Sequence, residues 1–150
     1  MAYDRFKTSV SYVLVINVLK RIVTSIKSLG TVTFEPGTYI YIGSANVKNP
    51  LARVLRHFRK DKKIKWHIDY LTTAPEVRIQ VAITCYGLAE DSIYEVMLKQ
   101  PYVSVALRKF GSTDRRGHLT HLFKLGRRHD MLHLIDSLLR KCKCVEIVAD

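Results

Sequence analysis

The sequence predicts an α/β (α+β) domain with a small central antiparallel or mixed β-sheet flanked by helices. The first third of the chain is rich in β-branched and aromatic residues between Gly and Pro turns, which is typical of hairpins. Later segments repeat their apolar residues with the spacing of amphipathic helices. With 150 residues, 47% of them hydrophobic, we expect one packed core and no room for two independent enzyme domains.

The expected strands are short runs bounded by turn residues. Residues 12–20 (YVLVINVLK) open the series, and residues 21–27, 31–34 and 38–43 follow as an antiparallel hairpin array. Residues 77–84 alternate apolar and polar side chains and form a later strand.

The expected helices follow from capping residues and apolar spacing. Asn49 is the N-cap and Pro50 the first-turn residue of a helix that runs to about Lys60. A second helix spans residues 89–99, and Asp130 caps a final amphipathic helix.

The end of the chain forms an extension of the main domain. We expect a domain over residues 1–125 and a C-terminal extension over residues 126–150. Residues 118–125 are a strand or a short helix, and residues 144–148 a short final strand. Two roles stay open for the extension, packing on the domain's own sheet or dimerisation, so both a monomer and a homodimer are compatible with the sequence.

The charge of the chain indicates a polyanionic partner. Lys and Arg outnumber Asp and Glu by 25 to 13, which gives a net charge of +12 and favours nucleic acid. Residues 50–65 carry 7 basic groups and 1 acidic group, residues 66–98 carry 1 and 5, and residues 99–128 carry 8 and 1. Such an order is expected if carboxylates hold a metal ion inside a phosphate-binding surface. Two solvated surface faces would give the same pattern.

The cysteines and apolar runs indicate a cytoplasmic protein. Cys85, Cys142 and Cys144 are odd in number and lack the spacing of a zinc ribbon, so we expect reduced thiols and no disulfide scaffold. The longest uncharged N-terminal run, residues 8–19, is shorter than the ~20 apolar residues of a membrane span. We therefore expect no membrane partner and no export signal.

Four separated segments form a motif series. In order, they are residues 37–45 (GTYIYIGSA), Arg53-x-x-x-His57, residues 66–71 (WHIDYL), and residues 110–114 (FGSTD) with residues 121–123 (HLF). This series resembles the GIY-YIG nuclease superfamily, in particular a small archaeal and bacterial subgroup catalogued as a domain of unknown function. The resemblance covers roughly residues 9–125. It implies a GIY-YIG-like fold and a metal-dependent endonuclease that hydrolyses DNA with Mg²⁺ or Mn²⁺.

The resemblance also implies catalytic roles for the residues at matching positions. Tyr12 and Tyr41 take the places of the two family tyrosines and Arg53 that of the family arginine. His57 lies one turn after Arg53, and His67 has the position of a further active-site histidine in some members. A phenol with a pKa of ~10 acts as a base only if cations lower its pKa or a histidine relays the proton. A guanidinium holds the phosphate oxygens on which negative charge develops.

Without the motif, the same residues have ordinary structural interpretations. The two tyrosines would be half-buried sheet aromatics, and Arg53 and His57 would lie on a solvated helix face. For His67 and Asp69, capping of a short helix after Trp66 competes with a catalytic role. Asp114 and His121 would equally serve to hold their loop by hydrogen bonds.

Two departures from the superfamily pattern concern spacing and the metal ligand. The tyrosines are further apart than in most members, which implies an inserted hairpin around residues 21–34. The family glutamate falls on Ser92, so we expect the nearby Glu90, and second Glu95, to hold the metal. If neither carboxylate faces the tyrosines and Arg53, the alternative is a non-catalytic nucleic-acid-binding protein that retains the fold.

Further residues are expected to contact the nucleic acid. Most are cations of the two basic blocks, and the glycine at the strand end allows close approach of the backbone. On the first helix the i, i+3, i+4 and i+7 spacing from Arg53 to Lys60 would gather the basic side chains on one face. The expected contacts are Gly43, Arg56, Arg59, Lys60, Lys63, Arg115 and Arg116.

Overall fold

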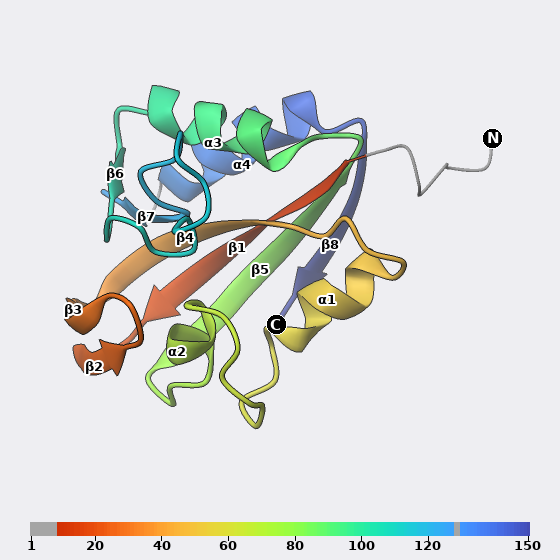
Figure 1. Ribbon diagram of the computed structural model, residues 1–150. Coiled ribbons are helices and arrows are strands. Elements are labelled where there is room, and N and C mark those ends of the chain that lie inside the picture. Colours follow the sequence, from red (N-terminus) through yellow and green to blue (C-terminus); the bar gives the residue numbers. More distant parts are fainter. Residues whose placement is uncertain (1–8, 128–129) are drawn as a thin grey trace.

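A six-stranded antiparallel sheet forms the centre of the computed structural model, which describes residues 9–127 and 130–150 (Figure 1). Its strand order is β6-β7-β4-β1-β5-β8, and every neighbouring pair is antiparallel. The strands are β1 (Val10–Val18), β4 (Gly37–Ser44), β5 (Val77–Tyr86), β6 (Val103–Val105), β7 (Leu122–Leu125) and β8 (Cys144–Ala149). The predicted fold class, a small antiparallel sheet flanked by helices, is confirmed.

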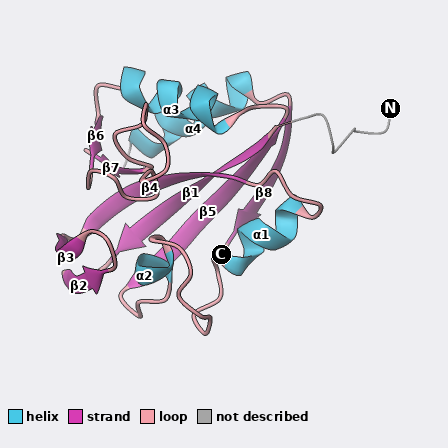
Figure 2. Ribbon diagram, in the orientation of Figure 1, coloured by secondary structure: helices cyan, strands magenta, loops and turns pink. Residues whose placement is uncertain are grey.

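Helices cover both faces of this sheet (Figure 2). They are α1 (Pro50–Arg56), α2 (Asp69–Thr72), α3 (Glu90–Lys99) and α4 (Asp130–Lys141). β1 is the central strand and is buried on both faces, so its side chains enter two cores. Tyr12 and its even-numbered neighbours pack with Val54 of α1, whereas Val13 packs with Ile93 of α3 and Leu134 of α4.

An inserted hairpin separates β1 from β4. Its strands β2 (Ile22–Ile26) and β3 (Gly30–Phe34) pair with each other in a separate two-stranded sheet. Positive φ angles at Ser28 and Gly30 form the tight turn between them. The hairpin predicted around residues 21–34 is therefore confirmed.

The first helix ends earlier than predicted. α1 stops at Arg56 because the Lys62 ammonium donates hydrogen bonds to the carbonyl oxygens of Arg56 and His57, which turns the chain back. Lys60 lies beyond the helix, and its ammonium donates to the carbonyl oxygens of Ala74 and Val77. The expected single cationic face from Arg53 to Lys60 was thus wrong.

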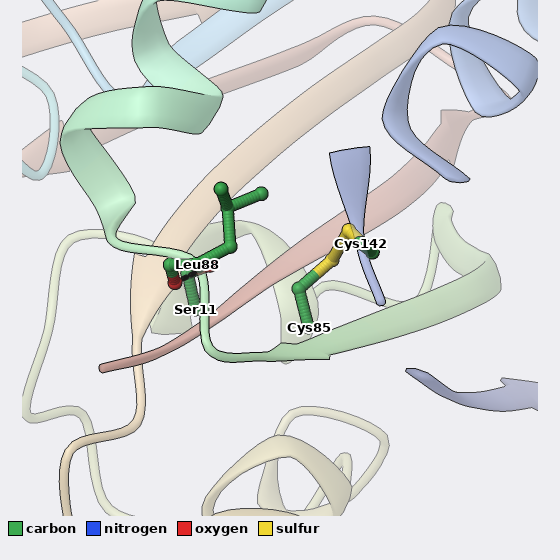
Figure 3. Close-up of a disulfide and its surroundings, with 4 residues drawn as sticks. All are labelled: Ser11, Cys85, Leu88 and Cys142. Atoms are coloured by element: carbon green, nitrogen blue, oxygen red, sulfur yellow. Dashed lines mark hydrogen bonds between the residues drawn. A yellow bond between two sulfur atoms is a disulfide. The ribbon is translucent and has the colours of Figure 1, made fainter. Parts of the chain in front are cut away.

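The C-terminal extension is part of the main sheet and core. β8 pairs with β5 along six residues, and Leu134 and Leu138 of α4 are fully buried. A disulfide joins Cys85 at the end of β5 to Cys142 just after α4, with the Cα atoms 5.4 Å apart (Figure 3). The expectation of three reduced cysteines was therefore wrong, because the fold brings these two together across 57 residues of sequence. Cys144 is exposed and free.

The helices of the described residues all lack the length and apolar character that a bilayer crossing requires.

Candidate active site

A cleft of about 210 Å³ opens where β1 and β4 meet α1, the start of α3 and the loop between β6 and β7. It contains six of the residues that the sequence predicted for the site. The lining residues are Tyr12, Tyr41, Gly43, Ser44, Arg53, Trp66, Glu90, Gly111, Asp114, Arg115 and His121. Residues from six separate parts of the chain therefore converge on one cleft.

Tyr12 and His57 form a buried pair beneath this cleft. The Tyr12 hydroxyl lies 2.8 Å from Nε2 of His57, and both side chains are buried. Burial, helped by the charge of Lys62, lowers the pKa of His57 from 6.5 to about 3, so the imidazole is neutral at pH 7. Burial also raises the pKa of Tyr12 well above its ordinary value, and Tyr41 adds to this effect. At rest the pair is a hydrogen bond between two neutral groups.

Gly43 makes room for Tyr12. The two residues are direct partners across β1 and β4, and a Cβ at Gly43 would lie 2.4 Å from Cζ of Tyr12. The space of the missing side chain is therefore filled by the tyrosine ring. Gly43 borders the cleft as predicted, but the close approach that needs a glycine is made by Tyr12.

Tyr41 forms the adjoining wall from the middle of β4. Its ring packs edge-on against Phe110 and His57, with centroids 6.3 Å and 6.1 Å away. Burial is the main cause that raises the pKa of Tyr41, and the carboxylate of Glu90 adds to it. The phenol is therefore protonated at neutral pH and presents a hydrogen-bond donor. The loop at Gly111 closes over this ring, since a Cβ there would lie 3.2 Å from it.

Arg53 lines the cleft with a guanidinium that is free of carboxylate partners in the described part of the chain. Its Nη1 donates a long 3.5 Å hydrogen bond to the carbonyl oxygen of Ser44, and its Cζ lies 5.4 Å from the Trp66 ring centroid. Most of its donors remain available. A guanidinium whose N–H donors are available can bind two oxygens of a phosphate at once.

Arg56 has a structural partner instead. Its guanidinium donates to both carboxylate oxygens of the fully buried Asp69 at 2.9 and 3.1 Å, and it stacks 4.4 Å from the Trp66 ring centroid. Asp69 also accepts hydrogen bonds from the backbone N–H groups of Lys65 and Trp66. Burial would raise the pKa of Asp69, but the bonds from Arg56 and these N–H groups outweigh it and lower the pKa.

Several predicted residues lie outside the cleft. Arg56 and Lys60 bind Asp69 and backbone carbonyls and do not line the cleft, so their expected contact with nucleic acid stays a prediction. Arg59, Lys63 and Arg116 are exposed and do not line the cleft.

His67 also lies behind the cleft and not in it. Its Nδ1 accepts a hydrogen bond from the N–H of Gly111 at 2.9 Å, and its Nε2 lies 3.1 Å from the Ser28 hydroxyl. Since Nδ1 is an acceptor, the proton of the neutral ring is on Nε2 and is donated to Ser28. His67 thereby connects the inserted hairpin to the loop that covers Tyr41.

Beside Asp114, Glu90 is the second carboxylate that lines the cleft with the tyrosines. It is the first residue of α3, its side chain is 10% exposed, and burial raises its pKa against the opposing charge of Arg115. Arg115 contacts both Glu90, at 3.5 Å, and Asp91. Glu95 is exposed further along α3 and does not line the cleft, so the structure does not bring this second candidate ligand to the tyrosines and Arg53.

Two histidines adjoin Glu90. Nε2 of His121 lies 3.4 Å from Glu90 Oε1 and 2.8 Å from Nδ1 of His118, and one ligand atom from each of the three residues lies within 4.8 Å of the others. Burial, helped by His118, lowers the pKa of His121 to about 4. From the sequence, His121 was open between a loop contact and a site role, and His118 was not predicted. Their spacing of three residues was the signal that could have paired them.

Comparison with protein families identifies a family that this chain matches over most of its length. A family model described as "Domain of unknown function DUF123" matches residues 11–144, which reach from the first strand through the last helix. Neither the curated proteins nor the solved structures contain a match.

Proposed function

We propose that this chain, which belongs to the DUF123 family of domains of unknown function, is a metal-dependent endonuclease that hydrolyses DNA phosphodiester bonds. The observation that carries the proposal is the convergence of Tyr12, Tyr41, Arg53 and Glu90 on one cleft. The resemblance to GIY-YIG nucleases singled out the tyrosines and Arg53, and Glu90 was expected to replace the family glutamate, whose position Ser92 occupies. A carboxylate in the same cleft also favours hydrolysis over mere nucleic-acid binding.

Arg53 is suited to bind the scissile phosphate. The reaction adds negative charge to the phosphate oxygens in the transition state, and a guanidinium held beside them stabilises that charge. Its freedom from carboxylates leaves it available for this task. The protonated hydroxyl of Tyr41 could donate a hydrogen bond to a phosphate oxygen in the same cleft.

Tyr12 and His57 are suited to remove the proton of the attacking water. The raised pKa of Tyr12 excludes a free tyrosinate as the base. The Tyr12 hydroxyl therefore has to give up its own proton while it accepts a proton from the attacking water. His57 Nε2, 2.8 Å away, is the acceptor for that proton. The negative charge of a bound phosphodiester would raise the pKa of His57 and so favour this transfer.

Glu90 is suited to hold the divalent ion, and the neighbouring imidazole of His121 fits the same purpose. When bound, Mg²⁺ or Mn²⁺ would act as a Lewis acid that stabilises negative charge on the phosphate and leaving oxygen. Exposed cations outside the cleft, among them Arg59, Lys63 and Arg116, would add sequence-independent attraction to the DNA backbone.

Cleavage assays test the proposal. Purified protein is incubated with branched, nicked, single-stranded and duplex DNA, and with an RNA duplex, in Mg²⁺ or Mn²⁺. We expect DNA products that a chelator abolishes. Arg53→Ala should lower kcat about 10²- to 10³-fold, as loss of a transition-state donor does elsewhere. Arg140→Ala, which removes an exposed arginine of α4 with no assigned role in the site, is the matched control and should keep its kcat.

Three results would overturn the proposal. They are no cleavage by the wild-type protein, cleavage unchanged by Arg53→Ala, and cleavage of RNA alone. Salt-sensitive DNA binding without products or metal dependence would identify a binding protein instead.

A further inference from the structure

The cluster of Glu90, His118 and His121 has nearly the spacing of a metal coordination sphere. Metal–ligand bonds of ~2.0 to 2.1 Å at tetrahedral angles place neighbouring ligand atoms about 3.3 to 3.4 Å apart. The distance between His121 Nε2 and Glu90 Oε1 is 3.4 Å, and that between the two imidazole nitrogens is 2.8 Å. For a central ion the two rings would have to separate by about 0.5 Å, and one ligand atom of each of the three residues lies within 4.8 Å of the others.

Surrounding residues orient His118 for this role. Asp91 Oδ1 lies 3.0 Å from Nε2 of His118, which places the ring proton on Nε2 and leaves the lone pair of Nδ1 directed at His121. A carboxylate that accepts the second N–H of a histidine is the usual support of a metal ligand. The His118 ring is also stacked on Tyr94, with the centroids 4.0 Å apart.

We infer that Glu90, His118 and His121 bind one divalent first-row transition metal ion, such as Zn²⁺ or Mn²⁺, in preference to Mg²⁺. Imidazole nitrogen is a good ligand for transition metals, whereas Mg²⁺ prefers oxygen ligands and retains water. Three protein ligands leave a coordination position open, as in catalytic zinc sites. That position would face the cleft, since Glu90 and His121 both line it.

Arg115 is the side chain that would compete with the ion for Glu90. Its guanidinium lies 3.5 Å from Glu90 Oε1 and contacts Asp91, so it neutralises both carboxylates. Its side chain is 41% exposed, which allows it to move into solvent when an ion arrives. The ion and Arg115 therefore compete for Glu90.

The inference that a metal ion binds depends only on these side chains. A role of that ion in hydrolysis rests on the proposed function. The test uses full-length, tag-free protein stripped of metal with a chelator and titrated with Co²⁺, Zn²⁺ and Mg²⁺. We expect one Co²⁺ per chain with visible absorption from nitrogen coordination, displacement of Co²⁺ by Zn²⁺, and no displacement by equimolar Mg²⁺. His118→Gln and Glu90→Gln should weaken Co²⁺ binding by at least about 100-fold, because loss of an outer-shell support alone costs ~10- to 100-fold.

His133→Gln on the exposed face of α4 is the matched control and should bind Co²⁺ like the wild type. Absence of saturable binding, or binding unchanged by His118→Gln, overturns the inference.

Two further variants keep the test decisive if a ligand variant fails to fold. Asp91→Asn should weaken Co²⁺ binding about 10- to 100-fold. Arg115→Gln should tighten it, because the competing cation is gone. Since both side chains are partly exposed, opposite shifts would not arise from misfolding, and unchanged affinity in both overturns the inference.

The outcome also separates this inference from the proposed function. Stoichiometric Co²⁺ binding without DNA cleavage keeps the metal site and removes the nuclease. Cleavage in Mg²⁺ without binding of Co²⁺ or Zn²⁺ supports the nuclease and overturns the transition-metal site.

Discussion

Position 43 requires a glycine because the ring of Tyr12, its cross-strand partner, occupies the space that a side chain would need. In Gly43→Ala, a Cβ 2.4 Å from the Tyr12 ring would push the hydroxyl away from His57. We expect a loss of about 1 to 3 kcal/mol in unfolding free energy, as for other overpacked sites, measured by urea denaturation.

DNA cleavage by Gly43→Ala should fall as well, because the Tyr12–His57 pair is displaced. Gly117→Ala is the matched control, since nothing lies within 4 Å of a Cβ at that position. Equal stability and equal cleavage in the two variants would contradict the steric explanation.

His57 makes the stability of the fold depend on pH. Its pKa is about 3 in the folded protein and 6.5 in the unfolded chain, so between these values the unfolded state binds more protons. The contribution of His57 to the unfolding free energy should therefore have its full value above pH 6.5 and decrease as the pH falls toward 3. The decrease from this residue is at most about 1.4 kcal/mol per pH unit.

Urea denaturation at several pH values between about 7 and 5 measures this slope. His57→Gln should show a shallower pH dependence than the wild type, although it is less stable at neutral pH. His133→Gln, which replaces an exposed histidine, should retain the wild-type slope. A parallel slope in His57→Gln would exclude His57 as its source.

At the residue scale, local sequence patterns predicted which side chains meet in the cleft but not what each one contacts. The positions of Tyr41, Arg53 and Glu90 follow from the motif series and from the helix start at Glu90. The pairing of Arg56 with Asp69 does not, because it depends on the return of the chain after α1. His118 was missed for the same reason, since a loop and not a regular element places it.

At the scale of elements, the buried ion pair between Arg56 and Asp69 holds the segment after α1 in place. Asp69 is fully buried and Arg56 is its bidentate partner, so Arg56→Ala would leave a buried carboxylate without its main counter-charge. Loss of one partner of a buried pair typically costs ~3 to 5 kcal/mol. Because the Arg56 side chain is 23% exposed, we expect a loss near the lower end of this range in urea denaturation.

Arg59→Ala removes an exposed arginine from the same segment and should change stability by less than about 0.5 kcal/mol. If the two arginine variants are equally stable, the Arg56–Asp69 pair does not hold the segment after α1.

Elements with strong local signals were predicted well, and those fixed by distant contacts were not. β1, the inserted hairpin, β4 and α3 match the expected ranges closely, because alternation and turn residues define them locally. The C-terminus of α1 is set by the Lys62 side chain, which folds back over it. The short strand β6 exists through its pairing with β7, a contact that no local pattern encodes.

At the scale of the whole molecule, the C-terminal segment closes the sheet on the side of β5. β8 adds the edge strand, and α4 covers the same face as α3. The cleft lies on the other side of β1, between β4, α1 and the start of α3. The sequence predicted α4 and β8 as elements, but their place in the sheet depends on pairing with β5, far away in the sequence.

The Cys85–Cys142 disulfide attaches this C-terminal segment to the sheet. It closes a loop with a sequence separation of 57 residues, and the loss of chain entropy in the unfolded state then stabilises the fold by about 4 kcal/mol. Cys142→Ser should therefore lower the unfolding free energy by about 2 to 4 kcal/mol in urea denaturation without reductant. Cys144→Ser, which removes the exposed free thiol two residues away, should match the wild type. Reductant should destabilise the wild type and Cys144→Ser alike but leave Cys142→Ser unchanged, and a wild type insensitive to reductant would show that the bond does not stabilise the fold.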